Sequence, residues 1–558
     1  MTKVLSFPDL SLTDCKVIVR LHPVVYRTNA RHSPCNRNPM TTFAQAQQRA
    51  QARTPTRISH EFLLFVVLFG LAFFLRITHL EYNTVFVDEA IYATIGREFV
   101  AGADLQKATG WLFGSQMYPS LAAITDDFGG LVAVRGLSAI LTSIAAFFVF
   151  LTTLRLFGKH PALWALLIFG LTGSSISVGQ FATYDALGLP FLAFSMFLIA
   201  AALLASSWRQ NVLLTLGGLA FALSFLSKYI ALLYLPTLLF VGGVLFLYQG
   251  KSLRPLLIWF LIPAALVIIA FIVPNWVEVS DVFSGRHSTQ RVDSILIVKL
   301  IIEEIGFALP LALAGVVSRP AALLPEPSNR ILKSKWVLRA AAILIVGSAL
   351  ALPVFQLLTS NIRSLEKHSV YALALLAPLA GQGVALLVDK VRLGAGLTQP
   401  RLRAAGAVVT IAGLIWFTNY LLDRNWGFQN SWPNISGAVH YLRENGLNAD
   451  SLVLASASAT YEYYFDFDIY TSRKIWYNTW WMLYKGLEGE AAMKAAIIDR
   501  ALDFVILDNY YTPAINAVLE PVLEAAGYTI GYEENMALPN SAPIFIRIYV
   551  PPDQEPSA

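Results

Sequence analysis

Long apolar runs dominate the chain from residue 61 to residue 421. About eleven of them approach the length that an α-helix needs to cross roughly 30 Å of hydrocarbon. They cover residues 61–79, 131–153, 161–178, 186–205, 212–227, 229–248, 255–273, 296–317, 337–355, 370–388 and 404–421. The run at 296–317 is the weakest, because Lys299, Glu303 and Glu304 interrupt one half of it. The pattern predicts a polytopic α-helical membrane protein with about 11 transmembrane helices.

Composition supports this class and excludes others. Hydrophobic residues make up 56% of the 558 residues and charged residues only 14%, whereas soluble domains carry about 25% charged residues. The net charge of +5 does not indicate a nucleic-acid partner, because the basic residues are scattered through short loops without an RNA-binding aromatic motif. The two cysteines, Cys15 and Cys35, exclude a cysteine metal site in the rest of the chain.

The loops between the apolar runs predict the orientation. One set is basic and contains Glu326 and Asp389 as its only acids; it comprises residues 40–60, 154–160, 206–211, 249–254, 318–336 and 389–403. The positive-inside rule makes this side cytoplasmic. With an odd number of spans, the C-terminal residues then lie outside, as does the loop 80–130. We therefore expect a multi-pass protein of the plasma or inner membrane, bacterial or archaeal because the chain is short.

The two ends of the chain differ from the apolar body at 60–421. Residues 1–59 are polar and predict a disordered cytoplasmic leader, in which Met40 is a candidate for the natural start. In residues 422–558 the apolar runs shorten to strand length. Strands are expected at 451–456, 504–507 and 543–550, with helices near 436–445, 489–502 and 514–526. This alternation predicts a small external α/β domain.

The expected α/β domain is rich in aromatic residues: Tyr461, Tyr463, Tyr464, Phe465, Trp476, Tyr477, Trp480 and Trp481. Exposed aromatic rings stack on sugars or lie at the membrane interface, whereas buried rings form a core. The sequence leaves these alternatives open.

An adjacent pair of acids, Asp88 and Glu89, follows the first apolar run. After the pair, Ile91, Ile95 and Phe99 recur at the spacing of one helix face, which predicts an amphipathic helix in the membrane interface. Asp88 can therefore serve as an N-cap and Glu89 as a first-turn acid. A carboxylate at the water–lipid boundary can also act on a water-soluble hydroxyl. Both interpretations are compatible.

Other ionisable residues gather on the same predicted outer side. They are Arg76, Arg135, Asp185, Lys228, Arg363, Glu366, Lys367 and His368. Each alone can snorkel or pair, but ionisable groups at membrane depth are costly and usually face a cavity. Their clustering suits an anionic lipid and a neutral nucleophile. Asp88, Glu89 and Asp185 also allow a divalent cation, on weak grounds because the acids are far apart in sequence.

The segment Val87–Tyr92, placed after one span, resembles the polyprenyl-phosphate-sugar-dependent glycosyltransferases of the GT-C superfold. The nearest branch resembles the protein O-mannosyltransferases and the lipid A aminoarabinose transferases. The resemblance covers about residues 60–390, and its further matches are at Arg76, Arg135, Asp185, Lys228, Tyr371 and Pro378. Two positions depart from the pattern: Tyr118-Pro119-Ser120 stands where the family often has His-Pro-Pro, and Lys367-His368 where it often has Arg-Tyr.

The resemblance implies transfer of a sugar from a polyprenyl-phosphate donor to an acceptor hydroxyl, with inversion and with Asp88 as the general base. Glu89 and Asp185 would orient Asp88 or the substrates. Groups for the donor phosphate would be Lys228, Arg363, Lys367, His368 and Arg135. The implied partners are the lipid-linked donor, a glycan, lipid or protein acceptor, and membrane lipid; no cofactor is required.

Two other functions fit parts of the pattern. A transporter or flippase of a lipid-linked sugar would share the cavity and its charges, but transporters usually show inverted repeats or broken spans at matching positions, and none is visible here. A membrane scaffold would not explain charges gathered on one side. An external domain of about 135 residues favours the handling of an acceptor, and hence the glycosyltransferase.

Overall fold

The computed structural model describes residues 59–103, 113–283, 292–316, 335–360, 364–390, 399–465, 475–480, 482–537 and 543–552. The leader expected at 1–59 lies outside this range except for Ser59, and so do Arg363 and Trp481.

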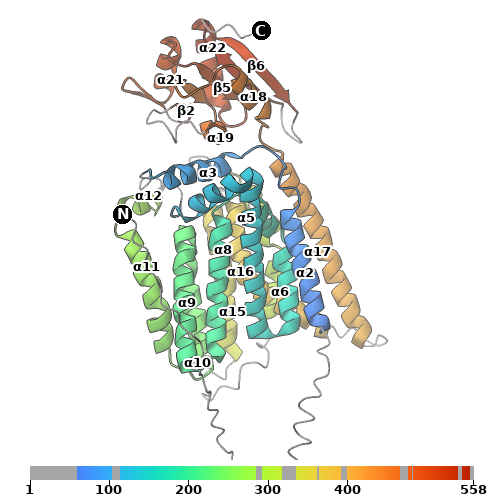
Figure 1. The fold of residues 1–558 in the computed structure, drawn as a ribbon. Helices are drawn as coiled ribbons and strands as arrows, with labels where there is room; N and C mark the ends of the chain where they lie inside the picture. The colour runs from blue at the N-terminus through green and yellow to red at the C-terminus, as the bar shows by residue number, and fades with distance from the viewer. Residues whose placement is uncertain are drawn as a thin grey trace, which may run out of the picture. The chain divides into compact units, whose positions relative to one another are not determined.

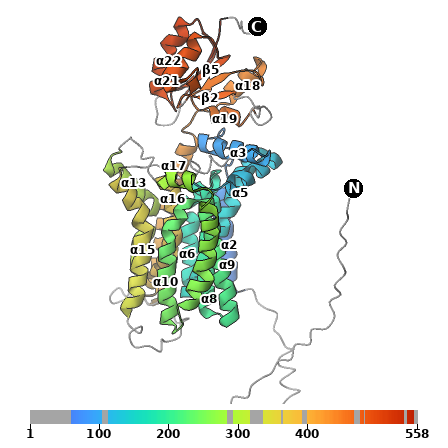
Figure 2. The ribbon, with the colours of Figure 1, turned by 90° about the vertical axis from the view of Figure 1, so that its left-hand side faces the viewer.

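Long apolar helices form the body of the protein and run side by side (Figure 1 and Figure 2). They are α2 (His60–Ile77), α5 (Met117–Phe157), α8 (Asp185–Leu204), α9 (Ser207–Ser227), η2 (Tyr229–Tyr234) with α10 (Leu235–Tyr248), α15 (Lys335–Leu358), α16 (Leu365–Lys390) and α17 (Gln399–Gln429). α16 is the central helix, because 89% of its apolar window is buried, against 11% in α2. The apolar side chains that α2 exposes suit contact with lipid.

The described residues contain eight helices long and apolar enough to span a membrane, or nine if one bent pair is a single span. The expected number of eleven is therefore not confirmed. The run 161–178 is α6 (Lys159–Leu171) and α7 (Gly173–Gln180), bent by 58°, because Thr172 between them has an extended backbone.

Two further runs do not form long helices. Residues 255–273 give a π-helical turn, η3 (Leu256–Leu261), and the short helix α11 (Ile262–Ile272). Residues 296–317 break at Gly306 into α13 (Ser294–Ile305) and α14 (Ala308–Val316). Lys299, Glu303 and Glu304 signalled a weak run at 296–317, but hydropathy alone did not show where either run would be divided.

The helix α3 (Val87–Val100) lies across one end of the long helices and packs on the first part of α5 (Figure 1). α5 itself kinks at Gly129 and Gly130, and Gly130 adopts a φ of 63° that favours glycine. The predicted helix after the acidic pair is thus confirmed. The N-cap is Phe86 and not Asp88, so Asp88 and Glu89 are both acids of the first turn. The Glu89 carboxylate accepts the backbone N–H of Phe86 at 3.1 Å.

The C-terminal residues fold into an α/β domain with a five-stranded sheet in the order β2-β1-β5-β7-β6. The strands are β1 (Val453–Ala455), β2 (Trp476–Asn478), β5 (Phe504–Asp508), β6 (Thr529–Met536) and β7 (Ile544–Val550), and a hairpin joins β3 (Leu483–Tyr484) to β4 (Leu487–Glu488). β1, β2 and β5 are parallel, and β7 is antiparallel to both of its neighbours. The three expected strands are confirmed as β1, β5 and β7. α17 runs on to Gln429, past the expected domain boundary at residue 421.

Helices cover both faces of this sheet. They are α18 (Ser436–Glu444), α19 (Ser458–Glu462), α21 (Gly489–Ile498) and α22 (Pro513–Ala525). Alternate residues of β5 enter two separate cores, Phe504 and Ile506 on one face and Val505 and Leu507 on the other, as the period of a strand requires. Most described aromatic residues near Tyr461 are buried, so the core interpretation holds for them.

The crossing of α3 and α5 depends on Gly96. A Cβ atom at this position would lie 2.0 Å from the carbonyl oxygen of Pro119, so the two backbones would have to separate. We expect Gly96→Ala to lower the free energy of unfolding by about 1–3 kcal/mol, as overpacking does. Gly70→Ala is the matched control, because a Cβ at Gly70 of α2 meets nothing within 4 Å. Thermal unfolding in detergent measures both; equal melting temperatures for the two variants would refute the close crossing.

Candidate active site

Three of the predicted acids form ion pairs near the end of the bundle that α3 crosses. The pairs are Glu89 with Arg135, Asp185 with Lys228, and Asp88 with Lys367. The charges of Asp88 and Asp185 act on both lysines, so the latter two pairs belong to one site. The structure therefore brings together residues that lie up to 279 positions apart.

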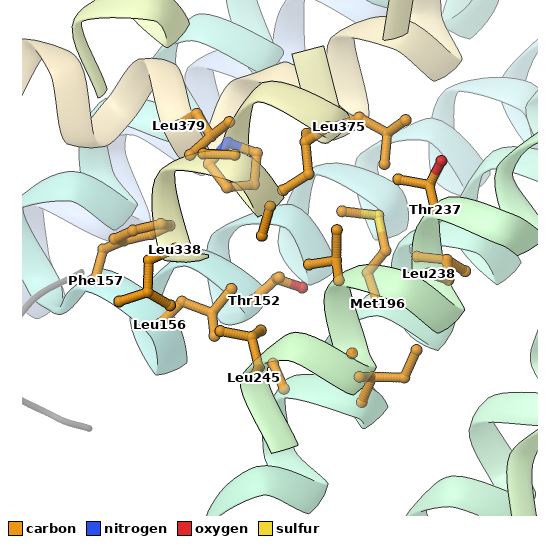
Figure 3. Close-up of a pocket in the computed structure, with 18 of the residues that line it drawn as sticks. Thr152, Leu156, Phe157, Met196, Thr237, Leu238, Leu245, Leu338, Leu375 and Leu379 are labelled. Atoms are coloured by element: carbon orange, nitrogen blue, oxygen red, sulfur yellow. The ribbon is translucent and has the colours of Figure 1, made fainter. Parts of the chain in front are cut away.

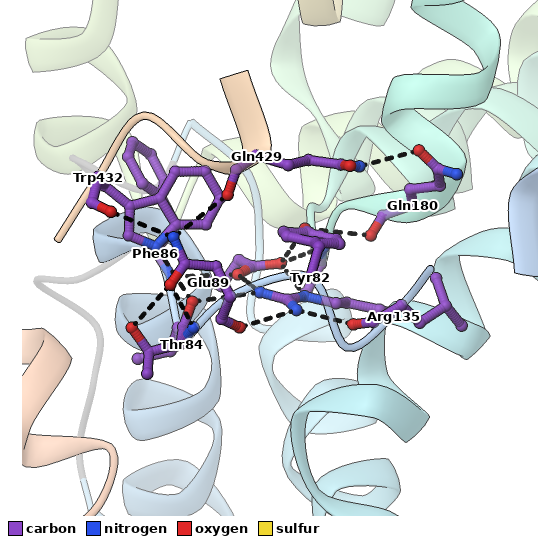
Figure 4. A network of polar contacts seen from close by, with 12 residues as sticks. Tyr82, Thr84, Phe86, Glu89, Arg135, Gln180, Gln429 and Trp432 are labelled. Atoms are coloured by element: carbon purple, nitrogen blue, oxygen red, sulfur yellow. Dashed lines mark hydrogen bonds and ion pairs between the residues drawn. The ribbon is translucent and has the colours of Figure 1, made fainter. Parts of the chain in front are cut away.

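The pair of Glu89 and Arg135 is closed to solvent, with both side chains 0% exposed (Figure 4). Arg135 donates from Nε and Nη2 to the two carboxylate oxygens at 2.9 and 2.7 Å. Glu89 also accepts the backbone N–H of Ala182 at 2.9 Å, and Arg135 donates to the carbonyl of Leu80 at 2.8 Å. Because both side chains are closed to solvent and bonded to each other and to nearby backbone, this pair clamps the start of α3 against α5.

The clamp continues into the end of α17 (Figure 4). Trp432 donates from Nε1 to the carbonyl of Thr84 at 3.1 Å, and Asn83 donates to the carbonyl of Gln429 at 3.2 Å. Gln429 in turn donates to the side-chain oxygen of Gln180 at 2.9 Å. These hydrogen bonds tie the segment before α3 to the end of α17 and to the residues that follow it. The first turn of α3, which carries Asp88, is therefore held in place.

The pair of Asp185 and Lys228 is also buried. The ammonium lies 2.6 Å from the carboxylate, with side chains 3% and 0% exposed. Lys228 stands at the break between α9 and η2, where its extended backbone ends the helix, and its ammonium lies 4.2 Å from the ring centre of Tyr184. The hydroxyl of Tyr371 donates to the carbonyl of Asp185 at 3.3 Å. This pair lies behind the surface of the site.

The pair of Asp88 and Lys367 is the open one. Lys367 donates from Nζ to Oδ2 of Asp88 at 2.5 Å, and the side chain of Lys367 is 20% exposed and that of Asp88 38%. Lys367 comes from the first turn of α16, and its ammonium lies 4.9 Å from the ring centre of Phe181. Among the three pairs, only this one presents both charges to a ligand from water.

The remaining predicted residues occupy different positions. His368 is half-buried beside Lys367, and in the described structure its Nδ1 has no hydrogen-bond partner. Arg135 serves Glu89 and does not reach the open site, and Arg363 lies outside the described residues. The three acids considered for a divalent cation each contact a different cation, and within the described ranges no three His, Cys, Asp or Glu side chains are placed to hold a metal ion.

Sequence analysis missed an acidic cluster around Arg424 of α17. The guanidinium lies 3.2 Å from Glu303, 2.6 Å from Glu304 and 3.8 Å from Glu366. The two acids that weakened the run 296–317 were the only available signal. Arg424 lies beyond the last predicted span, which ends at residue 421. It contacts Glu303 and Glu304 because α17 continues to Gln429.

A second missed group joins the outer face of α3 to the α/β domain. Asp126 pairs with Arg97 and accepts the hydroxyl of Tyr463 at 2.5 Å, and Arg97 donates to the carbonyl of Tyr463 at 2.9 Å. Burial and the bond to Asp126 raise the pKa of Tyr463, so this hydroxyl keeps its proton. A cleft of about 710 Å³ adjoins the group. Arg97 is nine residues from Asp88, which is about two and a half turns, so the two side chains face opposite ways.

An apolar cavity of about 110 Å³ lies deeper in the bundle (Figure 3). Leu375 and Leu379 line it from α16, two and three turns beyond Lys367. Thr152 and Thr237 supply the hydroxyl groups of the lining, and no charged residue contributes. The cavity suits hydrocarbon and cannot carry out acid–base chemistry.

Comparisons with known proteins bear on this geometry. Residues 120–277 match the family model of the Dolichyl-phosphate-mannose-protein mannosyltransferases. The crystal structure of ArnT from Cupriavidus metallidurans bound to undecaprenyl phosphate is similar over 88% of this chain and 99% of its own, with 14% identity and a TM-score of 0.55. Among curated protein sequences, none matches the chain.

Two more solved structures share the fold. The apo oligosaccharyltransferase of Archaeoglobus fulgidus is similar over 86% of this chain and 74% of its own, with 14% identity and a TM-score of 0.53. The arabinofuranosyltransferase AftD from Mycobacteria is similar over 89% of this chain and 40% of its own, with 13% identity and a TM-score of 0.53. This chain thus has the GT-C fold, and the resemblance that its sequence predicts to the glycosyltransferases of that fold is confirmed.

Proposed function

We propose that the protein is a membrane glycosyltransferase that moves a sugar from a polyprenyl-phosphate donor to an acceptor hydroxyl on the external face, with inversion. The observation that carries this proposal is the open pair of Asp88 and Lys367 within this fold. The comparisons support the donor class, because the family description names dolichyl phosphate mannose and ArnT was solved with undecaprenyl phosphate. The basic loops on the opposite side support the external face.

Asp88 is the proposed general base. The acceptor hydroxyl gives its proton to the Asp88 carboxylate while its oxygen attacks the anomeric carbon of the donor sugar. The bond from that carbon to the phosphate oxygen breaks, and the electron pair leaves with polyprenyl phosphate. Attack from the face opposite the phosphate inverts the anomeric centre. General-base assistance of this kind contributes about 10²–10⁴-fold to the rate.

Lys367 couples donor binding to this base. At rest its ammonium is held by Asp88. A donor phosphate offers stronger charge-assisted hydrogen bonds than a partly exposed carboxylate and draws Lys367 toward itself. Asp88 is then released to accept a proton, and Lys367 stabilises the negative charge that develops on the leaving phosphate. Asp88 therefore becomes available as a base only after the donor has bound.

The buried pairs take supporting parts in this proposal. Lys228 adds positive charge behind Lys367, and Asp185 keeps that charge paired while the site is empty. Glu89 positions Asp88 through the clamp with Arg135 and takes no proton from the substrate, because its side chain is 0% exposed. The apolar cavity beneath Lys367 offers hydrocarbon contacts to a lipid chain.

Asp88→Asn tests the base. We expect sugar release from radiolabelled polyprenyl-phosphate sugars, assayed with purified protein in lipid, to fall by about 10²-fold or more. The melting temperature should stay unchanged, because Asp88 is 38% exposed. Glu81→Gln is the matched control, an exposed acid seven residues earlier. Normal turnover by Asp88→Asn would refute the assignment. Intact donor binding without release by the wild type would favour a flippase.

Lys367→Gln tests the phosphate contact. We expect the Kd for polyprenyl phosphate to rise about tenfold or more, since a hydrogen bond to a charged group contributes about 1.5–3 kcal/mol. Lys494→Gln on the surface of α21 is the control for loss of a positive charge. The measurement is competition of unlabelled polyprenyl phosphate against labelled donor. An unchanged Kd would exclude Lys367 from the phosphate site.

Glu89→Gln and Arg135→Gln test the clamp. Each variant leaves one charge buried without its partner, so we expect each to lower the free energy of unfolding by about 3–5 kcal/mol. The double variant should lower the free energy of unfolding by less than the sum of the two single variants, because neither buried charge then remains. Denaturant titration in detergent micelles completes this cycle. Strictly additive losses would show that the pair does not act as a unit.

A further inference from the structure

The carboxyl ends of the parallel strands in the α/β domain form a topological switch point. From β1 the sheet continues to β2 on one side and to β5 on the other. The loops that follow these strands therefore diverge, and open α/β sheets bind their ligands in the crevice at such a point. In this domain the crevice lies beside Ser456, Thr479 and Asp508, which end or follow the strands.

Polar side chains fill the crevice and hold its loops in place. The hydroxyls of Thr479 and Thr512 lie 2.7 Å apart. Asp508 accepts the backbone N–H groups of Tyr510 and Tyr511 at 3.0 and 2.8 Å. Burial raises the pKa of Asp508 to about 6, although these backbone bonds favour its charged form. This network holds in place the loops from which Trp480 and Tyr511 project.

Two aromatic side chains project from these loops. Trp480 directly follows Thr479 and is 52% exposed, whereas Tyr461, Phe465 and Trp476 of the same aromatic group are buried. The ring of Trp480 meets that of Tyr511 edge to face, with centres 6.2 Å apart. Tyr511 in turn meets Tyr510 at 4.9 Å. The exposed indole of Trp480 therefore packs against Tyr511, which in turn packs against Tyr510.

The aromatic pair lies next to the candidate base. The ring centre of Tyr511 is 6.4 Å from that of Phe86, the N-cap of α3. The Asp88 carboxylate interacts electrostatically with the Tyr511 hydroxyl, so the two groups lie close together. Asp88 therefore lies near Lys367 from the bundle and near Tyr511 from the α/β domain.

We propose that Trp480, supported by Tyr511, is the platform on which a sugar ring of the acceptor stacks, so that the acceptor is a neutral glycan. This inference rests on the proposed glycosyltransferase function and names its acceptor class. Pyranose and furanose rings present apolar C–H faces to an indole and hydroxyls to the polar groups around it. The described loop residues 479–480 and 509–512 include no Lys or Arg, which favours a neutral ring over an acidic peptide or a phosphate.

Binding and kinetic measurements on the full chain in nanodiscs test this platform. The probes are neutral oligosaccharides of mannose, arabinose and galactose and a Ser/Thr peptide, observed by saturation-transfer NMR. We expect at least one oligosaccharide to receive saturation from the wild type. Trp480→Ala should abolish that signal and raise the KM for that glycan about tenfold, while Trp480→Phe should keep part of both. Trp208→Ala, which removes a 65% exposed indole from α9, should change neither.

The Asp88-dependent release of sugar to water, measured without acceptor, separates this inference from the proposed function. Trp480→Ala should leave that release at the wild-type rate, because the donor site is intact. Equal saturation of the glycan by Trp480→Ala and the wild type would overturn the platform, as would binding of the peptide alone. Weaker association of Trp480→Ala with lipid, with glycan binding unchanged, would make Trp480 a membrane anchor and also overturn it. If the wild type released no sugar, the proposed glycosyltransferase function would be refuted, whereas the proposed glycan site would not.

Discussion

The buried ion pair of Glu89 and Arg135 is the constraint on which the rest of the site depends. Two charges taken out of water are costly unless they meet each other and fill their remaining hydrogen bonds. Here the carboxylate also accepts backbone N–H groups and the guanidinium also donates to carbonyls. The two charged residues come from α3 and α5, and their backbone partners come from the segments before α3 and before α8. Satisfying the two charges therefore brings these parts of the chain together. The start of α3 is thereby fixed in position and in rotation.

That rotation separates the tasks of two neighbouring acids. Adjacent residues of a helix point about 100° apart, so when Glu89 faces Arg135, Asp88 must face elsewhere. It meets Lys367 at the solvent side. Asp185 and Lys228 repeat the same chemistry with both side chains buried. The three pairs have similar residue types and differ in exposure. Asp88 and Lys367 are exposed enough for a ligand to replace one partner, whereas the two buried pairs hold the structure.

α3 also connects the two halves of the proposed reaction. On one side it faces α16, which supplies Lys367 and, deeper in the bundle, the lining of an apolar cavity. On the other side it contacts the α/β domain through Arg97 and Tyr463, while its first turn lies close to Tyr511. A lipid-linked donor and a water-soluble acceptor approach from different phases. A helix at the boundary, held by both the bundle and the domain, is a suitable place for the group that acts between them.

The sequence alone determined that this is a membrane protein with many apolar helices, and it predicted where along the chain the residues of the candidate site lie. Hydrocarbon thickness forces long apolar runs, and the positive charges of loops fix a predicted orientation, so both can be read without a structure. The shorter strands of the C-terminal domain were predicted where they are apolar, as in β5 and β7. The polar strand β6 and the three-residue strand β2 gave no such signal.

Only the tertiary structure decided which of the candidate residues act together. Asp88 and Glu89 are equivalent in the sequence, and the partner of each was chosen by helix rotation and packing across tens to hundreds of positions. The bend at Thr172 and the break at Gly306 divided two runs that the hydropathy pattern predicts as single spans. Arg424 met its acids because α17 extended further than its apolar run. Pairing and exposure arise from contacts between distant segments, and local composition does not encode them.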